Sequence, residues 1–149
     1  MIRMQITSPA FVNNGRIPEG YTCDGLNVNP TLEISDVPIN ARSLALIMHD
    51  PDASGGDWSH WVVWKISPKT KIIKENSLPN GAVQGMNDFR NNEYGGPCSS
   101  SGIHHYHFQI YALDVLTDLD IRAEKTDLEA AMREHIIDQA VLIGTYSRV

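Results

Sequence analysis

Turn-forming residues interrupt the first two thirds of the chain at short, fairly even intervals. Clusters rich in Gly, Pro, Asn and Asp occur at NNGRIPEG, CDGLNVNP, SDVP, DASGGD, LPNGAVQG and NNEYGG. The segments between these clusters are short and have strand character, a spacing that is typical of a β-sandwich rather than of alternating strands and helices. We therefore expect an all-β dominated fold.

Three of these segments are predicted to be strong strands. They are Ser43–Asp50 (SLALIMHD), His60–Ser67 (HWVVWKIS) and Ile103–Asp114 (IHHYHFQIYALD). Each is almost continuously apolar or aromatic, which is typical of central strands that are covered on both faces.

One helix is predicted near the C-terminus, over residues 126–140 (TDLEAAMREHIIDQA). Thr126 and Glu129 have the spacing of a capping box, and Leu128, Met132 and Ile136 form one apolar stripe. We expect this helix to pack on the sandwich and a last strand to follow at 140–147. No internal repeat or linker is evident, so residues 1–149 are interpreted as one domain.

Charge and hydropathy exclude some partners. The net charge is −6 and the 12 Lys and Arg residues are spread thinly, which argues against nucleic-acid binding. No run of about 18 apolar residues predicts a membrane span, and the N-terminus MIRMQITSPAF alternates like a strand instead of resembling a signal peptide. We therefore expect a cytoplasmic protein.

Two cysteines, Cys23 and Cys98, are too few for a disulfide scaffold and lack C-x-x-C spacing. In a reducing cytoplasm both are most simply interpreted as buried thiols. Each lies in a glycine-containing loop, so a pairing brought about by the fold stays open.

Side-chain alternation points to one end of the strands. In the strand at 103–114, His104, Tyr106, Phe108 and Ile110 share the face expected to point inward, and His105, His107 and Gln109 share the other. The same alternation groups Trp58, His60, Val62, Trp64 and Ile66. On each of these two strand faces, polar side chains come first and apolar side chains follow. The mouth of a pocket would lie at the polar end.

Taken singly, these residues favour structural roles. A histidine that opens a strand is more often structural than functional, and Asp50 and Asp52 have the spacing to cap turns around Pro51.

The combination of motifs is more specific. The stretches DPDAS…WSHWVVWKI and YGGPCSSSGIHHYHFQIYALD together resemble the two signature regions of the phosphatidylethanolamine-binding protein family, which includes the Raf kinase inhibitory proteins. The resemblance extends to ITSPAF, IPEGYTCDGLNVNPTLEISDVP, GMNDF and HIIDQAVLIGTY, and it is strongest to the bacterial and archaeal branch. It implies a Greek-key β-sandwich with a small anion-binding pocket at one end.

The resemblance also implies the ligand-binding residues. They are Asp50, Asp52 and His60 in the first motif, and Gly96, Pro97, His104 and Tyr106 in the second. Members of the family accept phosphate-like anions and the phosphoethanolamine headgroup, and some inhibit kinases or serine proteases. We expect no catalytic residue, metal or cofactor, and a homodimer stays open.

The chain departs from the family pattern at three places. Ser54 replaces a proline, which suggests a looser pocket rim, and Ser99 and Ser100 replace two prolines after Cys98. His105 replaces an arginine, which we expect to remove a structural charge pair.

If the predicted residues converge, imidazoles, a phenol and backbone N–H groups around Gly96 can donate to an oxyanion. We expect the carboxylates to accept from His60 or His104, raising the pKa of these rings, or Asp52 to face the ammonium of an ethanolamine group. In both cases ligand binding strengthens as the pH falls. The alternative is an enzyme that uses the same pocket, with a metal ion at His60, His104 and Asp50 or with a hydrolytic serine at Ser99, Ser100 or Ser101.

Overall fold

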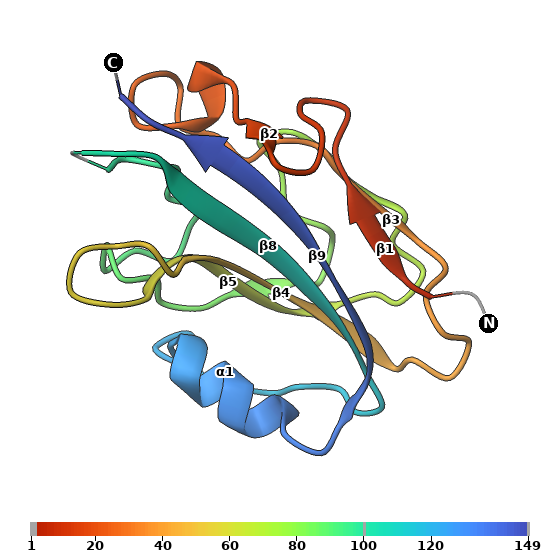
Figure 1. Cartoon of the computed structure of the whole chain (residues 1–149). Coiled ribbons are helices and arrows are strands. Elements are labelled where there is room, and N and C mark those ends of the chain that lie inside the picture. The colour runs from red at the N-terminus through yellow and green to blue at the C-terminus, as the bar shows by residue number, and fades with distance from the viewer. Residues whose placement is uncertain (1–2, 100, 149) are drawn as a thin grey trace.

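A computed structural model of the chain describes residues 3–99 and 101–148, and it consists of two β-sheets and one short α-helix (Figure 1). The small sheet has the order β1 (Gln5–Thr7), β3 (Leu32–Ser35) and β6 (Ile72–Ile73). The large sheet has the order β2 (Gly15–Arg16), β9 (Ile136–Tyr146), β8 (His104–Leu113), β4 (Ser43–Asp50), β5 (Trp58–Ile66) and β7 (Val83–Gln84). A single 3-10 turn, η1 (Glu19–Tyr21), follows β2. The predicted all-β dominated, two-sheet fold with a C-terminal helix is confirmed.

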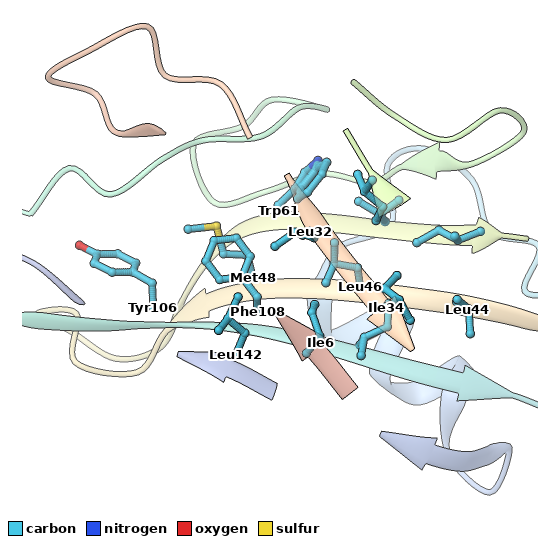
Figure 2. Close-up of a cluster of buried hydrophobic side chains, with 14 of the residues drawn as sticks. Ile6, Leu32, Ile34, Leu44, Leu46, Met48, Trp61, Tyr106, Phe108 and Leu142 are labelled. Carbon is cyan, nitrogen blue, oxygen red and sulfur yellow. The ribbon is translucent and has the colours of Figure 1, made fainter. Parts of the chain in front are cut away.

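The main core fills the space between the two sheets (Figure 2). Alternate residues of β4, among them Leu44, Leu46 and Met48, meet Ile6 of the small sheet and Phe108 of β8. This alternation is the period of two that a strand imposes on its side chains. Asp50 continues the β4 series, so the polar end of this strand lies at one end of the core.

The other face of the large sheet is covered by α1 (Lys125–Met132) (Figure 1). Leu128 and Met132 of the helix pack with Ala45, Ile47 and Trp64 of the sheet. Strands β4 and β5 are therefore buried on both faces, as their continuous apolar runs predict, whereas β8 presents half-exposed histidines toward one side. No helix in the described ranges is both long enough and apolar enough to cross a membrane.

The predicted helix is wrong at both ends. It begins at Lys125, where the backbone N–H of Glu124 donates to the Asp127 carboxylate at 2.9 Å, so the capping pair is not Thr126 and Glu129. It ends at Met132, and Glu134 then adopts a positive φ of 70°. Ile136 belongs to β9 and pairs with Leu113, because a long antiparallel ladder outweighs the helical spacing of one more apolar residue.

Strand β5 also departs from the predicted alternation, because it contains two bulges. His49 pairs with Ser59 and Met48 with Trp61, which leaves His60 as an extra residue. A second irregularity lies near Lys65, whose φ is 61°. As a result Trp58 and His60 face the end of the core, Val62 and Trp64 face the helix, and Ile66 returns to the space between the sheets.

Cys23 and Cys98 form a disulfide with a Cα–Cα distance of 5.4 Å. Cys98 is exposed, so the interpretation of both residues as buried thiols is wrong. The bond joins the loop after η1 to the loop before β8, and the backbone N–H of Cys23 donates to the carbonyl of Pro97 at 3.1 Å. Two loops that are 75 residues apart in sequence are thereby held together.

A candidate ligand pocket at one end of the sandwich

A pocket of about 350 Å³ lies where the core between the sheets reaches the end of the molecule. The β4–β5 loop, drawn in yellow, and the loop before β8 both lie at this end, on the left of Figure 1. The lining residues are Asp50, Ala53, Ser54, Trp58, His60, Phe89, Cys98, Ser99, Ser101, His104 and Tyr106. No Lys or Arg is among them, so the ionisable side chains of this lining are Asp50, His60, His104 and Tyr106.

Strand β8 places His104 and Tyr106 on the face that the alternation predicts. Tyr106 is fully buried at the end of the labelled core residues in Figure 2. Its hydroxyl makes no close hydrogen bond to a described residue, but the side chain of Ser99 lies near enough to lower the pKa of this phenol against the larger effect of burial. Burial raises the pKa of Tyr106 far above its ordinary value, so the side chain remains a neutral phenol with an O–H to donate.

The bulge in β5 places His60 beside Tyr106, with the ring centroids 5.2 Å apart. The Nδ1 atom of His60 lies 2.7 Å from the carbonyl oxygen of Gly95, and because a carbonyl can only accept, Nδ1 carries the proton. Burial lowers the pKa of His60, so the ring is neutral near pH 7. Asp50 does raise the pKa of this ring, as expected, but burial has the larger effect and the net shift is downward.

Asp50 is a buried carboxylate with a partner at each oxygen. Its Oδ2 atom lies 2.6 Å from Nδ1 of His104, and its Oδ1 atom accepts the backbone N–H of Asp52 at 2.9 Å. The Nε2 atom of His104 faces the carbonyl of Ser101 at 3.0 Å. The predicted contact between a carboxylate and a pocket histidine is thus present between Asp50 and His104.

Asp52 does not line the pocket. Its Oδ2 atom accepts both the backbone N–H and Nδ1 of His105, each at 2.8 Å, on the outer face of the sheet. The side-chain hydrogen bond from His105 lowers the pKa of Asp52. Asp52 is thus paired with His105 and is not among the residues that line the pocket, so its predicted contact with a ligand stays a prediction.

Gly96 and Pro97 shape the neighbouring loop instead of facing the pocket. The N–H of Gly96 donates to Oδ1 of Asn27 at 2.8 Å, and a Cβ on Gly96 would lie 2.2 Å from the carbonyl oxygen of Tyr21. The N–H of Gly95 donates to the carbonyl of His60 at 3.0 Å. The N–H groups of Gly95 and Gly96 are therefore already hydrogen-bonded within the protein, and neither is free to donate to an oxyanion.

Residues 7–147 match the family described as phosphatidylethanolamine-binding protein. The chain belongs to this family. The UPF0098 protein of Methanothermobacter thermautotrophicus is 47% identical over 150 residues, which cover 97% of this chain and 99% of that protein. The UPF0098 protein of Aquifex aeolicus is 41% identical over 152 residues, covering 97% and 89% of the two chains. The predicted bacterial and archaeal branch is confirmed.

Solved structures show the same fold. The crystal structure of a phosphatidylethanolamine-binding protein homologue from Chlamydia trachomatis superposes with a TM-score of 0.94 at 40% identity, covering 99% of both chains. The structure of YbcL from Escherichia coli, described as a member of the mammalian PEBP family, gives a TM-score of 0.92 at 28% identity and covers 99% of this chain and 100% of YbcL. Membership in the PEBP family suggests that the pocket binds an anion or another small ligand.

An aromatic wall of this PEBP-family pocket was not predicted. Trp58 and Phe89 are partly exposed, and their ring centroids lie 5.5 Å apart. Asn87 positions Phe89 by accepting its N–H at 3.0 Å, and it also donates to the carbonyl of His60 at 3.1 Å. Phe89 lies in the GMNDF segment, which resembles the family. The sequence of this segment alone does not indicate which of its side chains reaches the pocket.

The departures in the loops have separate outcomes. Ser54 and Ser99 line the pocket, and Ser100 lies outside the described residues. In the β4–β5 loop, Gly55 and Gly56 have φ values of 89° and 116°, which glycine adopts without strain. The glycine turn therefore directly follows Ser54, the residue that stands where the resemblance implies a proline.

The enzyme alternatives find little geometric support. In residues 3–99 and 101–148, no group of three His, Cys, Asp or Glu side chains is placed to hold a metal ion. A metal at His60, His104 and Asp50 would have to replace the hydrogen bonds that Asp50 and His104 now make. Within the same ranges, no serine hydroxyl is hydrogen-bonded to a histidine ring nitrogen, so a serine–histidine pair is also lacking there.

Proposed function

We propose that this protein is a non-catalytic binding protein that accepts a small phosphate-bearing ligand in the pocket. The candidates are inorganic phosphate and a headgroup of the phosphoethanolamine type. The observation that supports this proposal best is the hydroxyl of Tyr106, a buried donor that makes no close hydrogen bond to a described residue and belongs to a side chain that lines a pocket of about 350 Å³. Buried polar groups are nearly always hydrogen-bonded, so this hydroxyl indicates a ligand or water with an acceptor oxygen.

The remaining lining supports a ligand of low charge. The carboxylate of Asp50 is engaged by His104, and the lining contains no Lys or Arg that could offset a dianion. The lining also includes Ser99 and Ser101, which carry hydroxyls, and the aromatic side chains of Trp58 and Phe89. A phosphate group that carries a short organic substituent can use both kinds of surface.

An NMR titration with inorganic phosphate and with O-phosphoethanolamine tests the proposal. We expect saturable shifts of the His60 and His104 signals, and a loss of affinity of about tenfold in Tyr106→Phe, since a hydrogen bond to a charged group contributes about 1.5–3 kcal/mol. Tyr111→Phe is the matched control, because Tyr111 packs in the cluster under the helix. Absence of any response up to tens of millimolar ligand rejects the proposed function.

A regulatory role toward a kinase or a serine protease extends this proposal. Trp58 and Phe89 form an exposed apolar rim at the pocket, with 37% and 38% of their surfaces accessible, so a partner that covers the rim would also contact a bound ligand. Assays of kinase and serine protease activity in extracts of the native cell, with and without the purified protein, test this role. Equal inhibition by the wild type and by Trp58→Ala argues against a partner at the rim.

Cytoplasmic location and the absence of catalysis are further parts of the proposal. Cell fractionation tests the location. The location also bears on whether the disulfide forms, since disulfide bonds are uncommon in the cytosol outside hyperthermophiles. Incubation of the purified protein with phosphomonoesters, followed by measurement of released phosphate, tests for hydrolysis.

A further inference from the structure

We propose that His60 selects the ligand by accepting a hydrogen bond from it, so that the pocket binds phosphate groups that carry a P–OH and discriminates against sulfate and phosphodiesters. This inference rests on the proposed function and narrows it. The shared ligand chemistry is a protonated phosphate oxygen, which inorganic phosphate and phosphomonoesters offer. A phosphodiester, such as the headgroup of an intact phospholipid, does not offer it.

The first step is the tautomer of His60. Its Nδ1 atom is 2.7 Å from the carbonyl of Gly95, and the N–H of Gly95 donates back to the carbonyl of His60 at 3.0 Å. Asn87 holds the same loop in place, because its side-chain amide donates to the carbonyl of His60 at 3.1 Å and to the carbonyl of Glu93 at 2.8 Å. The loop therefore fixes the proton on Nδ1, and in the neutral ring the other nitrogen, Nε2, is an acceptor.

The second step is the surroundings of Nε2. Among the described residues, the close hydrogen bond of this ring is the one from Nδ1 to Gly95, and the backbone of Gly96 also lies near enough to the ring to raise its pKa. The unpartnered buried side-chain atoms of the same residues are those of Ser59, Tyr106 and Thr117, so Nε2 of His60 is not sealed in the interior. Because His60 lines the pocket, this nitrogen is open to a ligand there.

The third step is the charge of the ring. The ionisable groups near it are Asp50 of β4, Asp88 after β7 and Tyr106 of β8, and His104 of β8 lines the same pocket. Asp88 accepts the N–H of Ser59 at 2.7 Å, and Asp50 is held by His104. The two carboxylates do not outweigh the effect of burial, so His60 stays neutral and does not become a second donor.

The pocket thus offers a donor and an acceptor side by side. The rings of His60 and Tyr106 meet almost at a right angle, at 87°. A phosphate can accept from the Tyr106 hydroxyl with one oxygen and donate its P–OH to Nε2 of His60 with another. Sulfate and phosphodiesters carry no proton near neutral pH, so they would bring an oxygen lone pair against the lone pair of Nε2.

Isothermal titration calorimetry at about pH 7 with inorganic phosphate, sulfate and dimethyl phosphate tests the inference. Sulfate matches the dianion of phosphate in charge, and dimethyl phosphate matches the monoanion, while neither can donate. We expect phosphate to bind at least tenfold more tightly than either of them. Equal affinities overturn the inference and leave the proposed function standing, whereas failure of all three ions to bind overturns the proposed function itself.

Two variants separate selectivity from affinity. His60→Gln places an amide near the position of Nε2, and because an amide can also donate, we expect the ratio of phosphate to sulfate affinity to fall toward one. Tyr106→Phe removes only a donor, so both affinities should fall together and the ratio should stay. A ratio that is unchanged in His60→Gln overturns the inference.

Two further measurements do not depend on these variants. Glycerophosphoethanolamine is a diester, and O-phosphoethanolamine is a monoester with the same ammonium group, so a diester that binds as tightly as the monoester at about pH 5.5 contradicts the selection of P–OH. The ¹⁵N shifts of the wild-type His60 ring report its protonation directly. A ring that carries protons on both nitrogens in the phosphate complex overturns the inference.

Discussion

At the scale of single residues, the pocket depends on side chains whose hydrogen bonds are already assigned to one another. Asp50 is only 3% exposed, and its carboxylate holds both the ring of His104 and the start of the β4–β5 loop. Removing one partner of a buried charged pair leaves the other without compensation, which costs more than the pair itself contributes. Asp52 binds His105 in a similar way but in solvent.

This difference predicts unequal effects of two similar substitutions. Asp50→Asn should lower the free energy of unfolding by about 2–4 kcal/mol, because it removes a buried carboxylate that holds the partly buried His104 ring. Asp52→Asn should lower it by less than about 1 kcal/mol, since exposed ion pairs contribute little. Denaturant titrations measure both values. Similar losses in the two variants would contradict the roles that their burial assigns to them.

The lowered pKa of His60 predicts how stability changes with pH. The folded state takes up this proton at a lower pH than the unfolded state, whose pKa is about 6.5. The contribution of His60 is therefore fully present above that value and is lost as the pH falls through it. Burial lowers the pKa of His107 as well, with the same sign.

The measurement is the free energy of unfolding between about pH 7 and pH 5. We expect it to fall with pH in the wild type, and to fall less steeply in His60→Asn. Asparagine can still donate to the carbonyl of Gly95 but does not titrate in this range. An equal slope in the two proteins would show that the ring is not held neutral in the fold.

At the scale of elements, the sequence predicts strands well and irregularities poorly. The run at Ser43–Asp50 coincides with β4, because continuous burial on both faces leaves an unmistakable apolar segment. The bulge at His60 is set by pairing with β4 and has no local signal, so the faces of β5 were assigned wrongly beyond that point. Helix α1 was predicted too long for a similar reason, since Ile136 joins a ladder whose partner strand lies over 20 residues earlier in sequence.

The same distinction holds for the candidate site. His104 and Tyr106 were predictable because strand alternation fixes the direction of their side chains. Asp52, Gly96 and Pro97 were assigned to the pocket through the family resemblance, yet Asp52 pairs with His105 of β8, and Gly96 and Pro97 contact the loop around Cys23 and Asn27. The partners of loop side chains are set by tertiary contacts, and no periodic pattern in the sequence predicts these contacts.

Helix α1 offers a test of how separate the two faces of the large sheet are. Leu128 is fully buried under the helix, so Leu128→Ala should destabilise the protein by about 2–5 kcal/mol through the cavity that it leaves. Phosphate affinity should change less than twofold, because the pocket lies on the opposite face. Leu116→Ala, at a residue that is 56% exposed, is the control and should alter stability by less than about 0.5 kcal/mol. A large loss of affinity in Leu128→Ala would indicate that the sheet couples its two faces.

At the scale of the whole molecule, the pocket is assembled from segments that are distant in sequence. The β4–β5 loop, Phe89, the loop before β8 and the start of β8 itself all contribute to its lining. The only covalent link among the described segments at this end joins Cys23 to Cys98, and Cys98 is itself a lining residue. The disulfide therefore constrains the unfolded chain and also the loop that carries Ser99 and Ser101.

This dual role predicts that breaking the disulfide affects stability and binding together. The double variant Cys23→Ser/Cys98→Ser should lose about 2–4 kcal/mol of stability, because the crosslink removes entropy from the unfolded chain. Phosphate affinity should fall by about threefold to tenfold, since the freed loop must be ordered when the ligand binds. Thermal unfolding and calorimetry, each with and without dithiothreitol, measure the two effects.

The double variant is also the control for the reductant. Dithiothreitol should lower both the Tm and the phosphate affinity of the wild type toward the values of the double variant, while leaving the double variant unchanged. A lower Tm with unaltered affinity would show that the disulfide contributes to stability but not to ligand binding. Other contacts would then hold the loop before β8 in place, such as the hydrogen bonds of Gly96 to Asn27 and of Cys23 to Pro97.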